Sequence, residues 1–323
     1  MLREVRRIAL FHPPVYNQPS VQFRQRVVSE MIGRRKQELR ALVAAWIELA
    51  RDANQAREIE IVHQPICLPG LPKAFDGYLL AQLSDIHYDV HHGSFADQEH
   101  IEAAVRAINR IQPDLVVLTG DYVTASVAYI QPLVEMLAEI EARDGIFAVL
   151  GNHDFWSGAD RVARALRRRG IEVLRNTHTQ LRRDGDAVAL LGVDDATVLE
   201  HDLAAARRGV PRDMTTILLS HNPTLIAQAV RSGVDLMLSG HTHGGQIRLS
   251  PRSSRRRRSL WQGWRRFGPT QLYINRGLGT VVLPVRFQCP PEITVIELQC
   301  GSPRDRRWRF LRKRRARKRQ TLE

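Results

Sequence analysis

The sequence has only three cysteines in 323 residues and no long apolar run. The spacing of Cys67, Cys289 and Cys300 matches neither a zinc knuckle nor a redox pair, so we expect idle thiols in a reducing compartment. The best apolar candidate, residues 41–50, is shorter than the ~20 residues of a membrane-spanning helix. The apolar residues after the N-terminal arginines soon end in His-Pro-Pro, which leaves no signal-peptide core. These absences predict a cytoplasmic protein without a membrane span.

Acidic residues are also few, because 34 Asp and Glu stand against 48 Lys and Arg, for a net charge of +14. The surplus is concentrated in two places. Residues 252–266 contribute +7 and residues 301–323 contribute +9, which leaves the remainder of the chain at −2. This distribution excludes a protein that coats nucleic acid with its whole surface. It indicates a nearly neutral folded body, long enough for a large core, with two attached cationic segments.

The chain divides into three predicted regions. Between residues 21 and 57, apolar residues recur at three- and four-residue steps among charges of both signs, which predicts one or two amphipathic helices. We expect residues 1–58 to be a helical extension packed on the core, with an oligomerisation arm or a membrane-surface helix as alternatives. Residues 59–300 form the predicted main domain, and residues 301–323 are a basic C-terminal tail.

In the main domain, apolar strands alternate with helical patterns, which predicts an α/β fold of sheets flanked by helices on both sides. The predicted strands cover residues 59–66, 78–83, 115–118, 146–150, short pieces of 171–193, 216–219, 236–238, 246–249, 271–275, 280–283 and 293–298. The predicted helices cover residues 97–111, 132–142, 159–169, 199–208 and 223–231.

Five of the apolar strands end in residues that bind metals. The loops outside the carboxyl ends of such strands form the binding crevice of α/β sheets, so we expect these residues to converge. A single Asp or His after a strand is usually a cap or turn residue, but five successive cases favour a metal site. The residues are Asp85 and His87, Asp121, Asn152 with His153 and Asp154, His221, and His241 with His243.

Carboxylates, imidazoles and a carboxamide together suit a borderline divalent metal, and we expect Mn²⁺, with Fe²⁺ or Zn²⁺ as alternatives. The ligands are too many for one ion, and two ions need a bridging carboxylate, for which Asp121 on the middle strand is the candidate. A metal pair lowers the pKa of a bridging water and neutralises phosphate oxygens. This arrangement favours in-line attack of hydroxide on a phosphoester.

These motifs resemble, in order and spacing, the five blocks of the calcineurin-like metallophosphoesterases. The resemblance implies two facing mixed β-sheets flanked by helices, with a dinuclear site at their edge. It implies that His153 contacts the substrate phosphate and stabilises or protonates the leaving oxygen. Asp154 either orients His153 or caps the following turn. The first metal would take Asp85, His87, Asp121 and His243, and the second would take Asp121, Asn152, His221 and His241.

Further residues narrow the substrate class. Tyr122 follows Gly120-Asp121 without the Asp-Arg-Gly sequence of protein Ser/Thr phosphatases, which disfavours a phosphoprotein substrate. The segments at residues 241–246, 276–280 and 290–293 resemble the bacterial branch of membrane-associated phosphodiesterases and one type of UDP-2,3-diacylglucosamine pyrophosphatase. That branch implies a phosphodiester or pyrophosphate substrate, such as a lipid or a UDP-activated lipid A precursor. Its members commonly begin with a transmembrane segment, which this sequence lacks.

The basic segments combine arginine with tryptophan. Arg255, Arg256, Trp261 and Trp264 follow the last metal block, so we expect them to contact the substrate or an anionic membrane beside the site. Alternatively, these segments bind nucleic acid, or they bind nothing and are solvated charged residues. We therefore predict a metallophosphoesterase peripheral to the inner face of the membrane. The alternatives are a nuclease or cyclic-nucleotide phosphodiesterase and, among non-enzymes, a membrane-recruited metal-binding scaffold.

Overall fold

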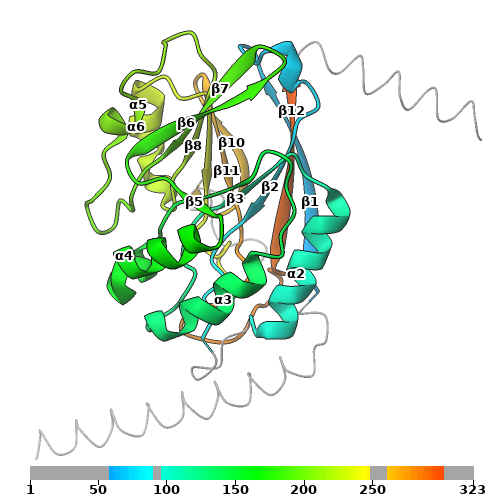
Figure 1. Cartoon of the computed structure of the whole chain (residues 1–323), viewed down its shortest axis with the longest axis vertical. Helices are drawn as coiled ribbons and strands as arrows, with labels where there is room; N and C mark the ends of the chain where they lie inside the picture. The colour runs from blue at the N-terminus through cyan, green and yellow to red at the C-terminus, as the bar shows by residue number, and fades with distance from the viewer. Residues whose placement is uncertain (1–57, 90–95, 248–259, 302–323) are drawn as a thin grey trace, which may run out of the picture. The chain divides into compact units, whose positions relative to one another are not determined.

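Two six-stranded β-sheets face each other across a shared apolar core, and helices cover their outer faces (Figure 1). The structure, a computed structural model, describes residues 58–89, 96–247 and 260–301. The predicted N-terminal helices, Arg255, Arg256 and the basic tail after residue 301 lie outside the described residues. The predicted α/β class, with two mixed sheets flanked by helices, is confirmed.

The first sheet has the strand order β1-β12-β2-β3-β4-β5. Strands β2 to β5 are parallel, and β12 pairs antiparallel with β2, so the sheet is mixed. Both faces of β3 are apolar because Leu115 and Val117 enter the core between the sheets while Val116 and Leu118 pack under the helices. The strands are β1 (Glu60–Leu68), β2 (Leu79–Leu83), β3 (Leu115–Leu118), β4 (Ile146–Ala148), β5 (Glu172–Val173) and β12 (Glu292–Cys300).

The second sheet has the order β10-β11-β9-β8-β7-β6. Its four central strands are parallel, and an antiparallel strand closes each edge. The buried Gln82 side chain of β2 donates to the carbonyl of Ser239 at the end of β9, which ties the two sheets together (3.0 Å). The strands are β6 (Thr177–Arg183), β7 (Asp186–Gly192), β8 (Thr216–Leu219), β9 (Leu236–Ser239), β10 (Gly263–Phe267) and β11 (Thr270–Ile274).

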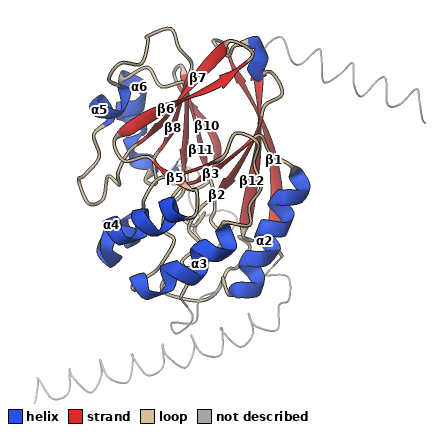
Figure 2. Cartoon of the chain, in the orientation of Figure 1, coloured by secondary structure: helices blue, strands red, loops and turns tan. Residues whose placement is uncertain are grey.

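The helices lie outside the strands, as Figure 2 shows by colour. Helices α2 (Gln98–Ile111), α3 (Ile130–Leu137) and α4 (Asn152–Arg168) cover the first sheet, and α5 (Leu203–Arg207) and α6 (Ile226–Arg231) cover the second. In the described part of the chain, none of these helices is long and apolar enough to cross a membrane. Short 3₁₀ turns occur at Lys73–Phe75, Val127–Tyr129 and Pro223–Leu225.

Two predicted helix boundaries are wrong for local reasons. Helix α3 ends at Leu137 rather than at residue 142, because Asn109 of α2 accepts from the backbone of Glu141 and donates to the carbonyl of Glu139, which draws this segment out of the helix. Helix α4 begins at Asn152, seven residues before the predicted start. Its first turn and its remainder are joined at Gly158, whose backbone is not helical (φ 117°).

Two strand predictions also need correction. Residues 280–283 form turns instead of a strand, and Val282 adopts φ 65°. The end of the basic segment 252–266, for which no strand was predicted, belongs to the edge strand β10 (Gly263–Phe267). Arginines on an edge strand oppose pairing with another chain, so an edge strand can have the composition of a solvated loop.

Candidate metal centre

The loops after five parallel strands meet at one edge of the two sheets. Loops after β2 and β3 of the first sheet contact loops after β8 and β9 of the second, and the loop after β4 contacts the loop after β3. Six of the predicted metal ligands fall into groups whose ligand atoms all lie within 4.8 Å of one another. The structure therefore brings together residues far apart in the sequence, namely Asp85, His87, Asp121, His221, His241 and His243.

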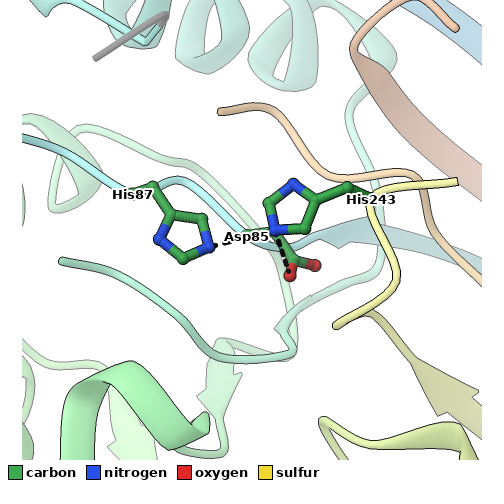
Figure 3. A group of neighbouring side chains, drawn as sticks. All are labelled: Asp85, His87 and His243. Atoms are coloured by element: carbon green, nitrogen blue, oxygen red, sulfur yellow. Dashed lines mark hydrogen bonds and ion pairs between the residues drawn. The ribbon is translucent and has the colours of Figure 1, made fainter. Parts of the chain in front are cut away.

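Asp85, His87 and His243 form the first group (Figure 3). The Nε2 atoms of His87 and His243 are 3.1 Å apart, and Nε2 of His243 is 3.4 Å from Oδ1 of Asp85. All three side chains are buried. Metal–nitrogen bonds of ~2.0–2.1 Å place two nitrogens on one ion ~3.0–3.4 Å apart. The spacing of these two imidazoles therefore fits ligation of a single cation.

Asp121 joins the first group to a second one. Its Oδ2 atom is 3.4 Å from Nε2 of His87 and 3.1 Å from Nε2 of His221. Nδ1 of His241 is 3.2 Å from the same His221 nitrogen. One carboxylate thus lies within reach of two adjacent cation positions, as a bridging ligand must.

Asn152 supplies an independent test of whether the site fits a cation. Its Oδ1 atom is buried, and among the described residues it has no hydrogen-bond partner. Its chain neighbours Gly151 and His153 both adjoin the Asp121 carboxylate. A buried carbonyl oxygen without a partner costs free energy, and a divalent cation accepts such an oxygen as a ligand. The carboxamide therefore fits the second position.

The backbone at these residues is strained. Non-glycine residues rarely adopt positive φ, yet Asp85, His87, Asp121, His241 and His243 have φ between 47° and 71°. Such conformations cost ~1–3 kcal/mol each and concentrate at functional sites. Five strained positions in one small cluster indicate that the fold holds these side chains for a purpose other than stability.

Contacts between the sheets hold the ligands in place. The carbonyl of Thr119 accepts from Nδ1 of His221 (2.7 Å), which leaves Nε2 of His221 to face Asp121. A hydrogen bond of this kind fixes the tautomer of a metal-binding histidine. The carboxylate of Asp85 accepts from the backbone N–H of His241 (2.9 Å). Gly240 allows this approach, because a Cβ atom there would lie 2.2 Å from Oδ2 of Asp85.

The charges of the site suit cation binding. Burial acts to raise the pKa of Asp121, but His221 and His87 beside it more than offset this and hold the pKa well below its usual value. Burial lowers the pKa of His243 to about 3 despite the attraction of Asp85. Burial opposes protonation of His221 too, but Asp121 raises its pKa to about 10. Ionised carboxylates and neutral imidazoles are the forms that bind metals, so at His221 a cation and a proton compete for one nitrogen.

His153 lies at the rim of the first group, where it is only partly buried. Its ring packs edge-on against His87, with centroids 4.7 Å apart. Its Nδ1 atom is 2.7 Å from the carbonyl of Thr124, and because a carbonyl only accepts, this nitrogen carries the proton. The Nε2 atom is therefore the one left to contact a substrate.

In the described part of the chain, Asp154 contacts backbone N–H groups, whereas the His153 ring contacts the carbonyl of Thr124. The buried carboxylate of Asp154 accepts from the backbone N–H groups of Asp121 (2.8 Å), Tyr122 (2.9 Å) and Gly151 (2.9 Å). These bonds join the loop after β3 to the first turn of α4. Asp154 therefore holds the loop that carries Asp121, in addition to capping the helix as the sequence suggested.

Trp156 is a residue of the site that the sequence interpretation missed. Its indole is 63% exposed and packs on the His153 ring with centroids 4.8 Å apart. Trp261, which the sequence interpretation included, lies against the loop after His243, because a Cβ atom on Gly245 would be 2.5 Å from its ring. Trp264 lies on edge strand β10, where its Nε1 donates to Gln271.

Comparisons with known proteins agree with this geometry. The family model described as calcineurin-like phosphoesterase matches residues 78–245, which include all seven predicted ligands. The chain is 32% identical over 249 residues to the metallophosphoesterase YkuE of Bacillus subtilis, covering 75% of this chain and 86% of that protein.

Two other relatives carry informative names. A Danio rerio transmembrane protein with a metallophosphoesterase domain is 30% identical and covers 81% of this chain, which spans 62% of that protein. Phosphodiesterase YaeI of Escherichia coli is 30% identical and covers 65% of this chain, which spans 79% of YaeI. The chain belongs to the calcineurin-like phosphoesterases, a family of enzymes that hydrolyse phosphoesters at a dinuclear divalent metal site.

Proposed function

We propose that this protein is a metal-dependent phosphodiesterase or pyrophosphatase whose substrate is a lipid or a nucleotide-activated lipid precursor such as a UDP-linked precursor of lipid A. The observation that carries the proposal is a chain of overlapping ligand groups, in which Asp121 lies between His87 of the first group and His221 of the second, with His153 beside them. The name of the relative YaeI supports a diester over a monoester.

The residues divide into two proposed ligand sets. Asp85, His87, Asp121 and His243 would hold one cation, and Asp121, Asn152, His221 and His241 would hold the other. We propose Mn²⁺, with Fe or Zn as alternatives, because the donors are mixed oxygen and nitrogen. When bound, the cations would activate water as a nucleophile and neutralise charge on the phosphate.

The remaining residues act on the substrate directly. In its imidazolium form, His153 would donate from Nε2 to a phosphate oxygen and pass that proton to the leaving oxygen, while Nδ1–H stays bonded to the carbonyl of Thr124. The hydrogen bonds that Asp154 accepts from backbone N–H groups would hold the loop of Asp121 in place during turnover. A scaffold that only binds metal has no need of a histidine in this position, so His153 favours the enzyme.

An activity panel tests the proposal. Purified protein with Mn²⁺ is expected to cleave bis(p-nitrophenyl) phosphate, and Asp121→Ala is expected to abolish this, because both cation positions lose a ligand. Asp213→Ala, which removes an exposed carboxylate elsewhere, is the matched control and should keep full activity. An active Asp121→Ala enzyme would refute the proposal.

The panel also separates substrates. UDP-2,3-diacylglucosamine and phospholipids represent the proposed class, and cyclic nucleotides, single- and double-stranded DNA, RNA and simple monoesters represent the alternatives. Cleavage of nucleic acid at rates above those for the lipid substrates would establish the nuclease alternative. Activity confined to monoesters would contradict the diester assignment.

We further propose that the enzyme works on the anionic, cytoplasmic surface of a membrane. Trp261 and Trp264 are half exposed beside an arginine-rich segment, and Val282 and Phe287 on the neighbouring turn are also exposed, Val282 by 92%. The side chain of Gln246 donates to the carbonyl of Val281 (2.8 Å), which ties this turn to the loop that follows the metal ligands. Arginine and tryptophan together suit an anionic bilayer interface.

Vesicle sedimentation tests this placement. Binding to vesicles that contain phosphatidylglycerol is expected to exceed binding to neutral phosphatidylcholine and to weaken with salt. The double variant Trp261→Ala/Val282→Ser should bind about tenfold more weakly. Leu199→Ser removes another largely exposed apolar side chain (82%) from a different loop and should bind as the wild type does. Equal binding by all three proteins would refute the membrane surface.

A further inference from the structure

Two adjacent acidic residues, Asp194 and Asp195, follow strand β7 at the same edge of the sheet as the metal centre. Strand β7 pairs in parallel with β8, with Gly192 opposite Leu219. The pairing continues one step further, because the N–H of Val193 donates to the carbonyl of Leu219 (3.2 Å). The Asp194–Asp195 turn therefore lies beside the loop that carries His221.

The two carboxylates have different surroundings. Asp194 accepts from Nε of Arg175 through both oxygens (3.0 and 3.1 Å), so its charge is compensated. Asp195 has no exposed surface, and its Oδ1 atom accepts from the backbone N–H of Thr197 (2.7 Å). Within the described ranges, no hydrogen-bond partner lies within reach of its buried Oδ2 atom. A buried carboxylate oxygen without a partner is costly, so this oxygen requires an explanation.

Asp195 is coupled to the second cation position. Burial lowers the pKa of His241 and opposes protonation of His221, and the negative charge of Asp195 acts in the opposite direction on both, which places Asp195 within electrostatic range of the two histidines of that position. The turn is also tied mechanically to the same loop, since Nδ2 of Asn222 donates to Oγ1 of Thr197 (3.0 Å). Asp195 is nevertheless not a member of the groups whose ligand atoms lie within 4.8 Å of one another. Its carboxylate is thus close to the site but beyond the ligands themselves.

We propose that Asp195 is an additional acidic group of the second cation position, where its unpaired oxygen accepts a hydrogen bond from solvent held by the cation and its charge strengthens cation binding. This inference rests on the proposed metal-dependent function. Groups just outside the ligands change metal affinity by about 10- to 100-fold when they are replaced. Asp195 would thereby tune how firmly the position formed by Asn152, His221 and His241 holds its cation relative to the first.

The test compares Asp195→Asn with Asp194→Asn in the full chain. Asparagine keeps the shape and the acceptor for Thr197 but removes the charge. Mn²⁺ binding is measured by calorimetry and by the electron paramagnetic resonance signal of free Mn²⁺. Asp195→Asn is expected to retain one site of wild-type affinity and to bind the second Mn²⁺ about 10- to 100-fold more weakly. Asp194→Asn should lower the thermal stability, because it breaks the pair with Arg175, without changing either affinity.

Several results would overturn the inference. Unchanged affinities in Asp195→Asn would show that the oxygen does not act on the cation. A fall of both affinities, or an equal fall in Asp194→Asn, would indicate a general structural or charge effect. Failure of the proposed function would give a different result. In that case the wild-type protein would bind no pair of divalent cations, or the Asp121→Ala variant would bind them as well as the wild type does.

Discussion

Replacing Asp154 with asparagine should destabilise the fold as well as the site, since its carboxylate accepts three short hydrogen bonds, of 2.8 to 2.9 Å, from backbone N–H groups. Oδ2 accepts from Asp121 and Gly151, and Oδ1 accepts from Tyr122, all within buried surroundings. Asparagine keeps one acceptor oxygen and turns its NH₂ group toward at least one of these donors. A buried N–H group left without an acceptor costs ~1–3 kcal/mol of stability. The remaining hydrogen bonds also become weaker, because their acceptor is no longer charged.

Part of this cost is offset. Burial and the neighbouring Asp121 raise the pKa of Asp154 to about 7, so the charge that the substitution removes is itself disfavoured. We therefore expect a net loss of about 2–4 kcal/mol in the free energy of unfolding at pH 8, a large fraction of the usual 5–15 kcal/mol. Urea unfolding of metal-free protein, followed by circular dichroism, measures this change.

His153→Ala is the matched comparison, because it alters the next residue of the same turn. It removes one hydrogen bond at the rim, so the free energy of unfolding should fall by no more than about 1 kcal/mol. Turnover of the diester should fall by about 10²–10⁴-fold with Mn²⁺ binding preserved. If Asp154→Asn proved as stable as the wild type and lost only turnover, Asp154 would be acting on His153 after all, and the reasoning from the backbone contacts would be refuted.

Two further substitutions test a close contact at the metal centre and a buried ion pair of the fold. Gly240→Ala places a Cβ atom 2.2 Å from Oδ2 of Asp85 and should lower Mn²⁺ affinity and turnover together; unchanged Mn²⁺ binding would contradict the close approach. Glu292→Gln breaks a buried pair with Arg276 and should cost ~3–5 kcal/mol in urea unfolding. Glu60→Gln removes the exposed partner of the same arginine and should cost no more than ~1 kcal/mol, so equal losses would contradict the assignment of burial.

The metal centre could be predicted because its residues directly follow the carboxyl ends of buried strands. Chain direction and apolar runs, on which this prediction depends, are both visible in a sequence. An apolar run of four residues, such as Leu115–Leu118, is buried on both faces, and whatever follows it emerges at the edge of the sheet. The same reasoning places Asp194 and Asp195, which follow another apolar run, at this edge of the sheet. The sequence does not show which of the two carboxylates is paired, however, since only the folded chain places Arg175 beside Asp194.

Other features depend on contacts between distant segments. The role of Asp154 follows from the amides of Asp121 and Tyr122, more than thirty residues away, so its position next to His153 was misleading. Trp156 lies beside His153 only because α4 begins early enough to place them one helical turn apart. The edge strand β10 escaped notice because its arginines conceal its alternating pattern.

The left-handed backbone at the ligands links these observations. Aspartate and histidine tolerate positive φ better than most residues do, but each such position still costs free energy. Hydrogen bonds between the sheets, such as Asp85 with the N–H of His241 and His221 with the carbonyl of Thr119, compensate for that cost. These bonds exist only when both sheets have docked. The ligand geometry is therefore a property of the assembled sandwich, and a cation that needs ligands from both sheets binds the completed fold and stabilises it against unfolding.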